Sequence, residues 1–329
     1  MSIIEKYQQH FLSAYSNYPH GRYISIFLLR QIESEAIFRT EGSGEPLNRE
    51  FVHAGTQAGD EIIQRVVISK RKQTAVERRT GRELLRKNDL LFTDPNQKAK
   101  PASPCALNRN NPCGKCMDCM IYGYAAGGGG AQKSRVITDD AFSLHPAHTI
   151  IDTRQFNALY DNNTMRDPEN REQASTSIGT DEYVKPESVF LDIETIKDVT
   201  AAEFQYILGN ILRSTRYGAI SSRIGKVQNR IVGIVLSDCE MVSNLEWTQA
   251  TYDALRGDDD EPDFPLHMET VQEKAAQTLA ALSQNVVGQV TILPQADVEA
   301  LLNEMKALYG DETAVTNLLK TATSAYPGN

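Results

Sequence analysis

The sequence lacks any apolar run long enough to cross a membrane. A transmembrane helix needs about 20 consecutive apolar residues, and no stretch of the 329 residues approaches that length. The N-terminus, Met-Ser-Ile-Ile-Glu-Lys, also lacks the pattern of a secretory signal peptide. The run of four glycines over 127–130 has no Gly-Lys-Ser/Thr ending, which excludes a P-loop nucleotide site. We therefore expect a cytoplasmic protein without a membrane partner.

Cysteine is scarce, with five residues in the chain, yet four of them fall within fifteen positions: Cys105, Cys113, Cys116 and Cys119. Four thiolates suit a tetrahedral zinc ion, and the segment 95–123 has too few apolar residues to build a core without a metal. The spacing is not that of a standard zinc ribbon. It partly matches an iron–sulfur run, so a cluster, or no metal at all, remains an alternative. We predict structural zinc, and clustered cysteines without a secretory signal favour a reducing cytosol.

The net charge of −9 conceals two regions of opposite sign. Residues 61–100 contain eleven Lys/Arg against five Asp/Glu, whereas residues 240–329 contain four against fifteen. A basic region on an acidic protein indicates a polyanionic partner, although a solvated charged helix would give the same composition.

Apolar patterns predict the regular elements. Strands are expected at Ile24–Leu29, Ile62–Ile68, Val136–Thr138 and Ile231–Leu236. Segment 189–193 alternates with Asp192 and Glu194, which is typical of a half-buried strand. Capping boxes at Thr74–Glu77 and Thr200–Glu203 predict helices that end near Lys87 and Gly218. Residues 41–59 are expected to be loop, and amphipathic helices follow Asp263.

Without its polar excursions the chain reads strand, helix, strand, strand, helix, strand. The prediction is an α+β fold with a modified RNA-recognition core, the ferredoxin-like βαββαβ arrangement. The same core occurs in many enzymes, so the fold alone does not give the function. The expected parts are a first piece of the core (1–94, with an inserted loop at 41–60), a zinc-binding insertion (95–123), core continued (124–158), a thumb-like excursion (159–185), core completed (186–250) and an acidic helical extension (251–329).

Three stretches resemble a known family. Ile121-Tyr122-Gly123, the glycines and Ser134-Arg135-Val136-Ile137-Thr138-Asp139-Asp140-Ala141 resemble a segment of the repeat-associated CRISPR proteins. Segment 167–190 resembles the excursion and return strand of their backbone subunits, and segment 207–235 their second helix and last strand. With the cysteine insertion, the chain is similar to the backbone subunit of the type I-D CRISPR effector complex. It departs from many relatives at 69–74, which is basic but lacks their glycine-rich loop.

The resemblance implies a function. Several copies would line up along one CRISPR RNA beside other effector subunits, grip its backbone in a basic groove, and leave guide bases exposed for target DNA. The thumb, about 159–183, would fold over toward the neighbouring copy. A head-to-tail interface of this kind gives an open helical row.

The residues predicted to contact RNA are basic and flank the expected first strand, the two helices and the glycine run. An Arg at a helix C-terminus, such as Arg213 or Arg216, would equally suit capping. The full set is Arg22, Lys70, Arg71, Lys72, Arg78, Arg82, Arg135, Arg213, Arg216, Arg223 and Lys226.

Two other functions stay open. Related proteins cut RNA, but here His145 and His148 lie outside any catalytic pattern, and the carboxylates at 41–45 lack a matching motif. We therefore predict that the chain is not an enzyme. A stand-alone zinc-containing RNA-binding module is the second alternative, and it would bind RNA one to one rather than in length-dependent multimers.

Overall fold

The computed structural model describes residues 2–39, 47–57, 61–91, 105–106, 112–126, 130–170, 172–218, 225–256 and 261–326. At its centre lies a curled antiparallel sheet with the strand order β11-β12-β1-β10-β7-β3-β2. Strand β6 also pairs with β10, and β13 pairs with β12. The strands are β1 (Tyr23–Ile32), β2 (Arg49–His53), β3 (Ile62–Ile68), β6 (Val136–Thr138), β7 (Ala141–Pro146), β10 (Val189–Lys197), β11 (Arg216–Tyr217), β12 (Gly225–Ser237) and β13 (Val290–Ile292). The predicted α+β class is confirmed.

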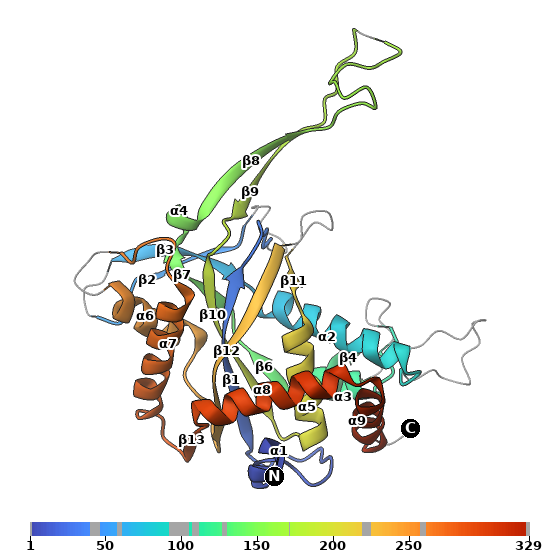
Figure 1. The fold of residues 1–329 in the computed structure, drawn as a ribbon, viewed down its shortest axis with the longest axis vertical. Coiled ribbons are helices and arrows are strands. Elements are labelled where there is room, and N and C mark those ends of the chain that lie inside the picture. Colours follow the sequence, from blue (N-terminus) through green and yellow to red (C-terminus); the bar gives the residue numbers. More distant parts are fainter. Residues whose placement is uncertain are drawn as a thin grey trace.

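Helices cover both faces of this sheet (Figure 1). Ile24, Ile26 and Leu28 of β1 face a core shared with α2 (Lys70–Lys87), α5 (Ala201–Arg213), α8 (Gln295–Gly310) and α9 (Glu312–Ser324). Phe27 and Leu29 face the opposite core, which includes α6 (Asn244–Arg256) and α7 (Met268–Ser283). The C-terminal helices therefore supply layers on both sides of the sheet. Helix α6 crosses the boundary expected at residue 250.

Strand β10 differs from its prediction. Its alternating pattern indicated one solvated face, yet Asp192 and Glu194 are both 0% exposed. Helix α2 and the C-terminal helices cover the two faces, so the acidic side chains point into protein rather than water. The prediction of a half-buried strand was wrong because the covering helices lie far away in the sequence.

The basic helix α2 begins earlier than expected. Its N-cap is Ser69, and Lys70 is its first residue. Thr74 caps nothing, since its hydroxyl donates to the Lys70 carbonyl one turn back at 3.1 Å. The capping box predicted at 74–77 is therefore wrong. Gly81 sits in the middle of α2 because a side chain there would collide with Tyr206 of α5.

The second predicted helix is confirmed. Thr200 and Glu203 form the reciprocal capping box that opens α5. The helix ends at Arg213 rather than near Gly218, because β11 follows at once. Part of the loop expected over 41–59 is strand β2, and residues 40–46 and 58–60 lie outside the described part. The remaining short elements are α1 (Ile3–Lys6), a 3-10 turn (Gln8–His10), α3 (Met117–Tyr122), β4 (Tyr124–Ala126), β5 (Gly130–Gln132) and α4 (Ala147–Ile150).

A two-stranded ribbon projects from the body of the molecule (Figure 1). It consists of β8 (Ile151–Asn157) and β9 (Ile178–Val184), paired in register from Ile151–Val184 to Asn157–Ile178. The excursion predicted from residue 159 thus begins at residue 151. Among the described residues, no helix is long and apolar enough to cross a membrane.

Candidate nucleic-acid interface and metal centre

Four thiols gather at one point. The sulfur atoms of Cys105, Cys113, Cys116 and Cys119 all lie within 4.8 Å of one another. Cys119 Sγ lies 3.5 Å from Cys105 Sγ and 3.9 Å from Cys113 Sγ. Four sulfurs at ~2.3 Å from a tetrahedral zinc ion would be about 3.8 Å apart. The spacing therefore fits such an ion, and the four cysteines are able to hold a metal.

The surrounding backbone supports thiolate ligands. The N–H groups of Lys115 and Cys116 point at Cys113 Sγ, at 3.4 and 3.2 Å, and donors of this kind favour the charged form. The pKa of Cys105 is lowered by hydrogen bonds with the other three thiols, most strongly by the one with Cys113. The pKa of Cys116 is raised by hydrogen bonds with the same group of thiols, most strongly by the one with Cys105. The four groups ionise together only when a cation compensates them.

A groove of about 1050 Å³ runs along α2 beside this cluster. Its lining includes Tyr122 and the apolar residues Val136 and Ile137. Among the described residues that line it, none is Asp or Glu, whereas seven are basic: Lys70, Arg71, Arg78, Arg79, Arg82, Arg86 and Lys133. A groove with cations and no carboxylate along its wall attracts a polyanion such as a nucleic-acid backbone.

The three cations predicted to precede the helix instead form its first turn. Lys70 and Arg71 are exposed and line the groove, while Lys72 is half-buried and does not. The first turn has no acidic residue of its own, and the Lys70 backbone N–H donates to Asp140 at 2.9 Å. Cations at the positive end of a helix dipole repel it, so a bound anion would relieve this repulsion.

Two predicted contacts on α2 are engaged within the protein. Arg78 donates from Nε and Nη2 to Asp118, both at 2.9 Å, and Arg82 donates to the same carboxylate at 2.5 Å. Asp118 is 0% exposed. These two arginines therefore bind the cysteine segment through Asp118.

Arg135 and Arg22 also make internal contacts. Arg135 is 8% exposed, and its guanidinium binds Glu203 at 2.5 Å and stacks over Tyr15 at 5.2 Å. Arg22 is half-buried and donates to the carbonyl of Phe11. Both arginines hold the fold together, and we leave them out of the proposed interface.

The remaining predicted contacts lie beyond α5. Arg213 is exposed and stacks over Tyr309 at 5.5 Å. Arg216 and Lys226 are exposed and stand directly opposite each other in the β11–β12 pair. Lys226 also pairs with Glu33 at 2.9 Å. Arg223 lies outside the described residues.

Three groove residues were missing from the predicted set: Arg79, Arg86 and Lys133. Arg86 continues the i, i+4, i+8 spacing of Arg78 and Arg82, so its position was readable from the helical repeat. Lys133 precedes the Ser134-Arg135 motif, from which Arg135 was predicted instead, although Arg135 is buried. Arg79 carried no separate signal in the sequence.

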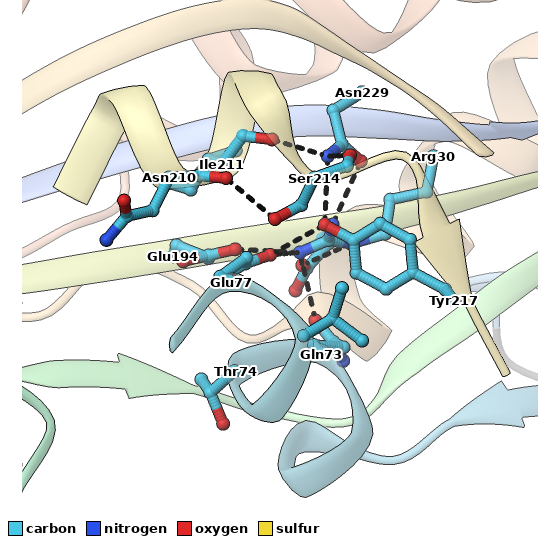
Figure 2. A network of polar contacts seen from close by, with 12 residues as sticks. Arg30, Gln73, Thr74, Glu77, Glu194, Asn210, Ile211, Ser214, Tyr217 and Asn229 are labelled. Atoms are coloured by element: carbon cyan, nitrogen blue, oxygen red, sulfur yellow. Dashed lines mark hydrogen bonds and ion pairs between the residues drawn. The ribbon is translucent and has the colours of Figure 1, made fainter. Parts of the chain in front are cut away.

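A buried arginine joins α2 to the sheet (Figure 2). Arg30 of β1 is 0% exposed, and its Nη2 lies 3.0 Å from Glu77, 2.6 Å from Asp192 and 2.7 Å from Glu194. Its Nη1 donates at 2.9 Å to the Tyr217 hydroxyl. Arg30 thus connects α2, β10 and β11. It thereby fixes the position of α2, the helix that lines the groove. In the sequence, Arg30 is the only charged residue of a mainly apolar strand.

The sequence matches a known protein family over most of its length. The model of the Csc2 CRISPR family matches residues 10–319. The chain belongs to the Csc2 CRISPR family. The resemblance to CRISPR backbone subunits drawn from the sequence is therefore confirmed, since this family is one of Cascade backbone subunits.

Solved structures give the fold. The crystal structure of Thermofilum pendens Csc2 is 17% identical, with a TM-score of 0.61 over 99% of this chain and 97% of that one. A chain of a CRISPR RNA-guided surveillance complex is 10% identical, with a TM-score of 0.46 over 82% and 87%, and at that level it supports no conclusion. Among curated proteins none matches. The chain shares the Csc2 fold along nearly its whole length.

Proposed function

We propose that this chain is a backbone subunit of a type I-D CRISPR effector complex that binds the guide RNA along the α2 groove. The observation that carries the proposal is a groove lined by seven cations, in a chain of net charge −9 that belongs to a CRISPR family. Lysine and arginine contact phosphate without reading sequence. Specificity is then delegated to pairing between the exposed guide bases and target DNA.

Several features support a multimer on the guide. The proposed ferredoxin-like RNA-recognition core is supported by the pairings of β12 with β1, β1 with β10 and β10 with β6, and by α2 and α5, which share one core. The ribbon of β8 and β9 extends from that core with no buried residue among the described positions 158–177. A polar projection that contributes nothing to its own core suits a contact with a neighbouring copy. We place the assembly in the cytoplasm, where thiols such as these stay reduced.

The RNA contact is tested by charge removal. Changing Lys70, Arg71 and Lys72 together to Ala should weaken single-stranded RNAs of different sequence about equally. It should also flatten the plot of log Kd against log salt by about 1.4, because Lys70 and Arg71, the two members of the set that line the groove, lose their phosphate contacts. Fluorescence polarisation from about 50 to 300 mM salt measures both effects.

A matched triple variant controls for net charge. Lys274, Lys306 and Lys320 lie on the C-terminal helices, outside the groove, and their change to Ala removes the same charge. This variant should retain the salt slope of the unmodified protein. Equal loss in both variants would show that net charge, not the groove, drives binding, and would refute the interface.

We infer that the metal is structural zinc. Purified protein should contain about one zinc per chain, and Cys119→Ser should lower that content and loosen the segment around 105–123, because a structural zinc site needs all four ligands. Atomic absorption measures the zinc, with Cys239→Ser as the control outside the cluster. Unchanged zinc in Cys119→Ser, or a brown protein with a broad visible band, would reject the assignment.

We also infer that the subunit is not a nuclease. His145 is buried, with a ring nitrogen 2.9 Å from the Asp263 carbonyl, and His148 lies at the surface, 3.3 Å from Glu261. Burial lowers the pKa of His145, which opposes the protonated form that a general acid would need. Both contacts suit structural histidines, and the early-loop carboxylates at 41–45 lie outside the described residues.

A further inference from the structure

The carboxylate of Asp118 joins the metal centre to the groove. Asp118 lies between two ligating cysteines, Cys116 and Cys119, in the first turn of α3. Despite its charge it is 0% exposed. Three N–H groups of α2 donate to it, two from Arg78 at 2.9 Å and one from Arg82 at 2.5 Å. Arg78 therefore binds this carboxylate through two parallel hydrogen bonds, the geometry that makes arginine pairs directional.

Arg82 also contacts Cys105, the first of the four cysteines. Its Nη1 lies 3.7 Å from Cys105 Sγ, and its Nη2 donates to the Cys105 carbonyl. The Arg82 guanidinium thus contacts both Cys105 and Asp118, which lies in the 113–119 segment. Arg82 therefore holds both Cys105 and the 113–119 segment against α2.

The charges explain why this arrangement depends on the metal. Four thiolates around a divalent ion carry a net charge of −2, and Asp118 adds one more. Arg78 and Arg82 neutralise two of these three charges in a site with little access to water. Removing the ion removes the metal–sulfur bonds that join the four cysteines, so the segments that carry Cys105 and Asp118 lose the point that holds them together.

The groove borders the same residues. Cys105, Ala106 and Tyr122 line it together with residues of α2, and the Arg78 guanidinium lies over the Tyr122 ring at 5.9 Å. Displacing the cysteine segment would remove this wall and release both arginines from their fixed positions. Apolar contacts of Met117 and Ile121 with the core remain, so the segment would shift rather than detach.

We propose that Asp118 is a positioning residue that couples metal loading to RNA affinity. It holds the cysteine segment against α2 only while the four cysteines share an ion, and the groove has its binding shape only in that state. Arg78 and Arg82 then serve the metal centre, and the phosphate contacts of α2 come from its other cations. This inference rests on the proposed RNA-binding function.

The test compares Asp118→Asn with the unmodified protein in zinc-loaded and chelator-treated forms. Asn keeps the shape but loses the charge and one acceptor. Zinc loss to a chromophoric chelator should become about 10- to 100-fold faster, as for other residues that support metal ligands. Hydrogen exchange of residues 74–86 in RNA-free protein should rise in the variant. Zinc removal should cause the same rise in the unmodified protein and no further rise in Asp118→Asn.

The RNA measurement completes the cycle. Zinc removal should weaken binding of a labelled single-stranded RNA at least fivefold in the unmodified protein, a typical coupling between two sites. In Asp118→Asn the ratio between the two forms should approach one. Glu83→Gln, which removes an exposed charge from α2, should behave like the unmodified protein. Asp118→Glu, which restores the carboxylate, should recover part of the coupling.

The outcomes separate the inference from the proposed function. If Asp118→Asn retains zinc and exchange protection like the unmodified protein, the coupling is refuted whether or not RNA binds. If no RNA binds any form while zinc loss and exchange respond as described, the RNA function fails and the link between metal and helix stands. Should Asp118→Asn not fold, Arg78→Gln removes the guanidinium and its paired hydrogen bonds to Asp118 from the other side, and it must accelerate zinc loss.

Discussion

Replacing Arg30 by Met should lower the free energy of unfolding by about 3–5 kcal/mol, the usual consequence of leaving buried charges without their partner. The side chain is 0% exposed and contacts Glu77, Asp192 and Glu194 at 3.0 Å or less. Met fills a similar volume without charge, so the effect comes from the stranded carboxylates. Urea unfolding followed by circular dichroism measures it.

An exposed arginine serves as the control for this variant. Arg39 forms a surface pair with Asp181 at 3.1 Å and is 43% exposed. Arg39→Met should cost less than about 1 kcal/mol, because water screens such pairs. Equal effects of the two substitutions would show that the buried cluster has no special role.

The hydrogen atoms of the cluster indicate a shared proton. Nη2 of Arg30 has two hydrogens but faces three carboxylate oxygens. Glu77 Oε2 and Glu194 Oε2 are buried without a hydrogen-bond partner. Burial, and next the charge of Glu77, raises the pKa of Glu194 well above its ordinary value of 4.5. Burial also raises the pKa of Glu77, against the attraction of Arg30. A proton on one of the two glutamates would reduce the net negative charge of Arg30 and its three carboxylates, and it would supply a donor where both glutamates have a buried oxygen without a partner.

This proton gives stability a defined pH dependence. A carboxyl with a raised pKa keeps a proton in the folded state that the unfolded chain has released, so stability falls as pH rises from 4.5 to the folded-state pKa. Glu194→Gln supplies a fixed N–H donor in place of that proton. It should be more stable than the unmodified protein at neutral pH and lose less stability over this range. A less stable Glu194→Gln variant would reject the shared proton.

Shortening the ribbon should abolish ordered multimers while leaving a folded subunit that still binds RNA. Asn157 and Ile178 pair directly across β8 and β9, so an Asn-Gly turn can replace residues 158–177 and close the hairpin. The removed positions that the structure describes include no buried residue. Mass photometry on RNAs of increasing length should show copies added with length for the unmodified protein and single copies for the shortened one.

Exposed apolar side chains refine this test. Leu159 and Ile178 near the ribbon tip are 57% and 62% exposed, and Val287 on the body is 95% exposed. Changing the first two to Ser should weaken multimers, whereas Val287→Ser should not. If the shortened protein assembles like the unmodified one, the ribbon does not join neighbouring copies. If the unmodified protein stays at one copy per RNA at every length, the stand-alone RNA-binding module becomes the better function.

Local sequence patterns determined much of this protein. The capping box at Thr200–Glu203 involves residues three apart, and it opens α5 as predicted. Four cysteines within fifteen positions predicted the thiol cluster, because a short segment can bring its own side chains together. Apolar runs located β3 and β6 with the predicted bounds, whereas β1 and β12 are longer than predicted. Alternation located β10.

The tertiary structure alone decided which charges line the groove and which hold the fold together. Arg30, Glu77 and Glu194 are far apart in the chain and meet only because β1, α2 and β10 pack together. Arg82 was predicted from the sequence to contact RNA, but in the structure it binds Asp118 of the cysteine segment. The free energy of a charged side chain depends on what surrounds it in space. That environment comes from residues distant in sequence, so composition predicted a basic region but not its binding surface.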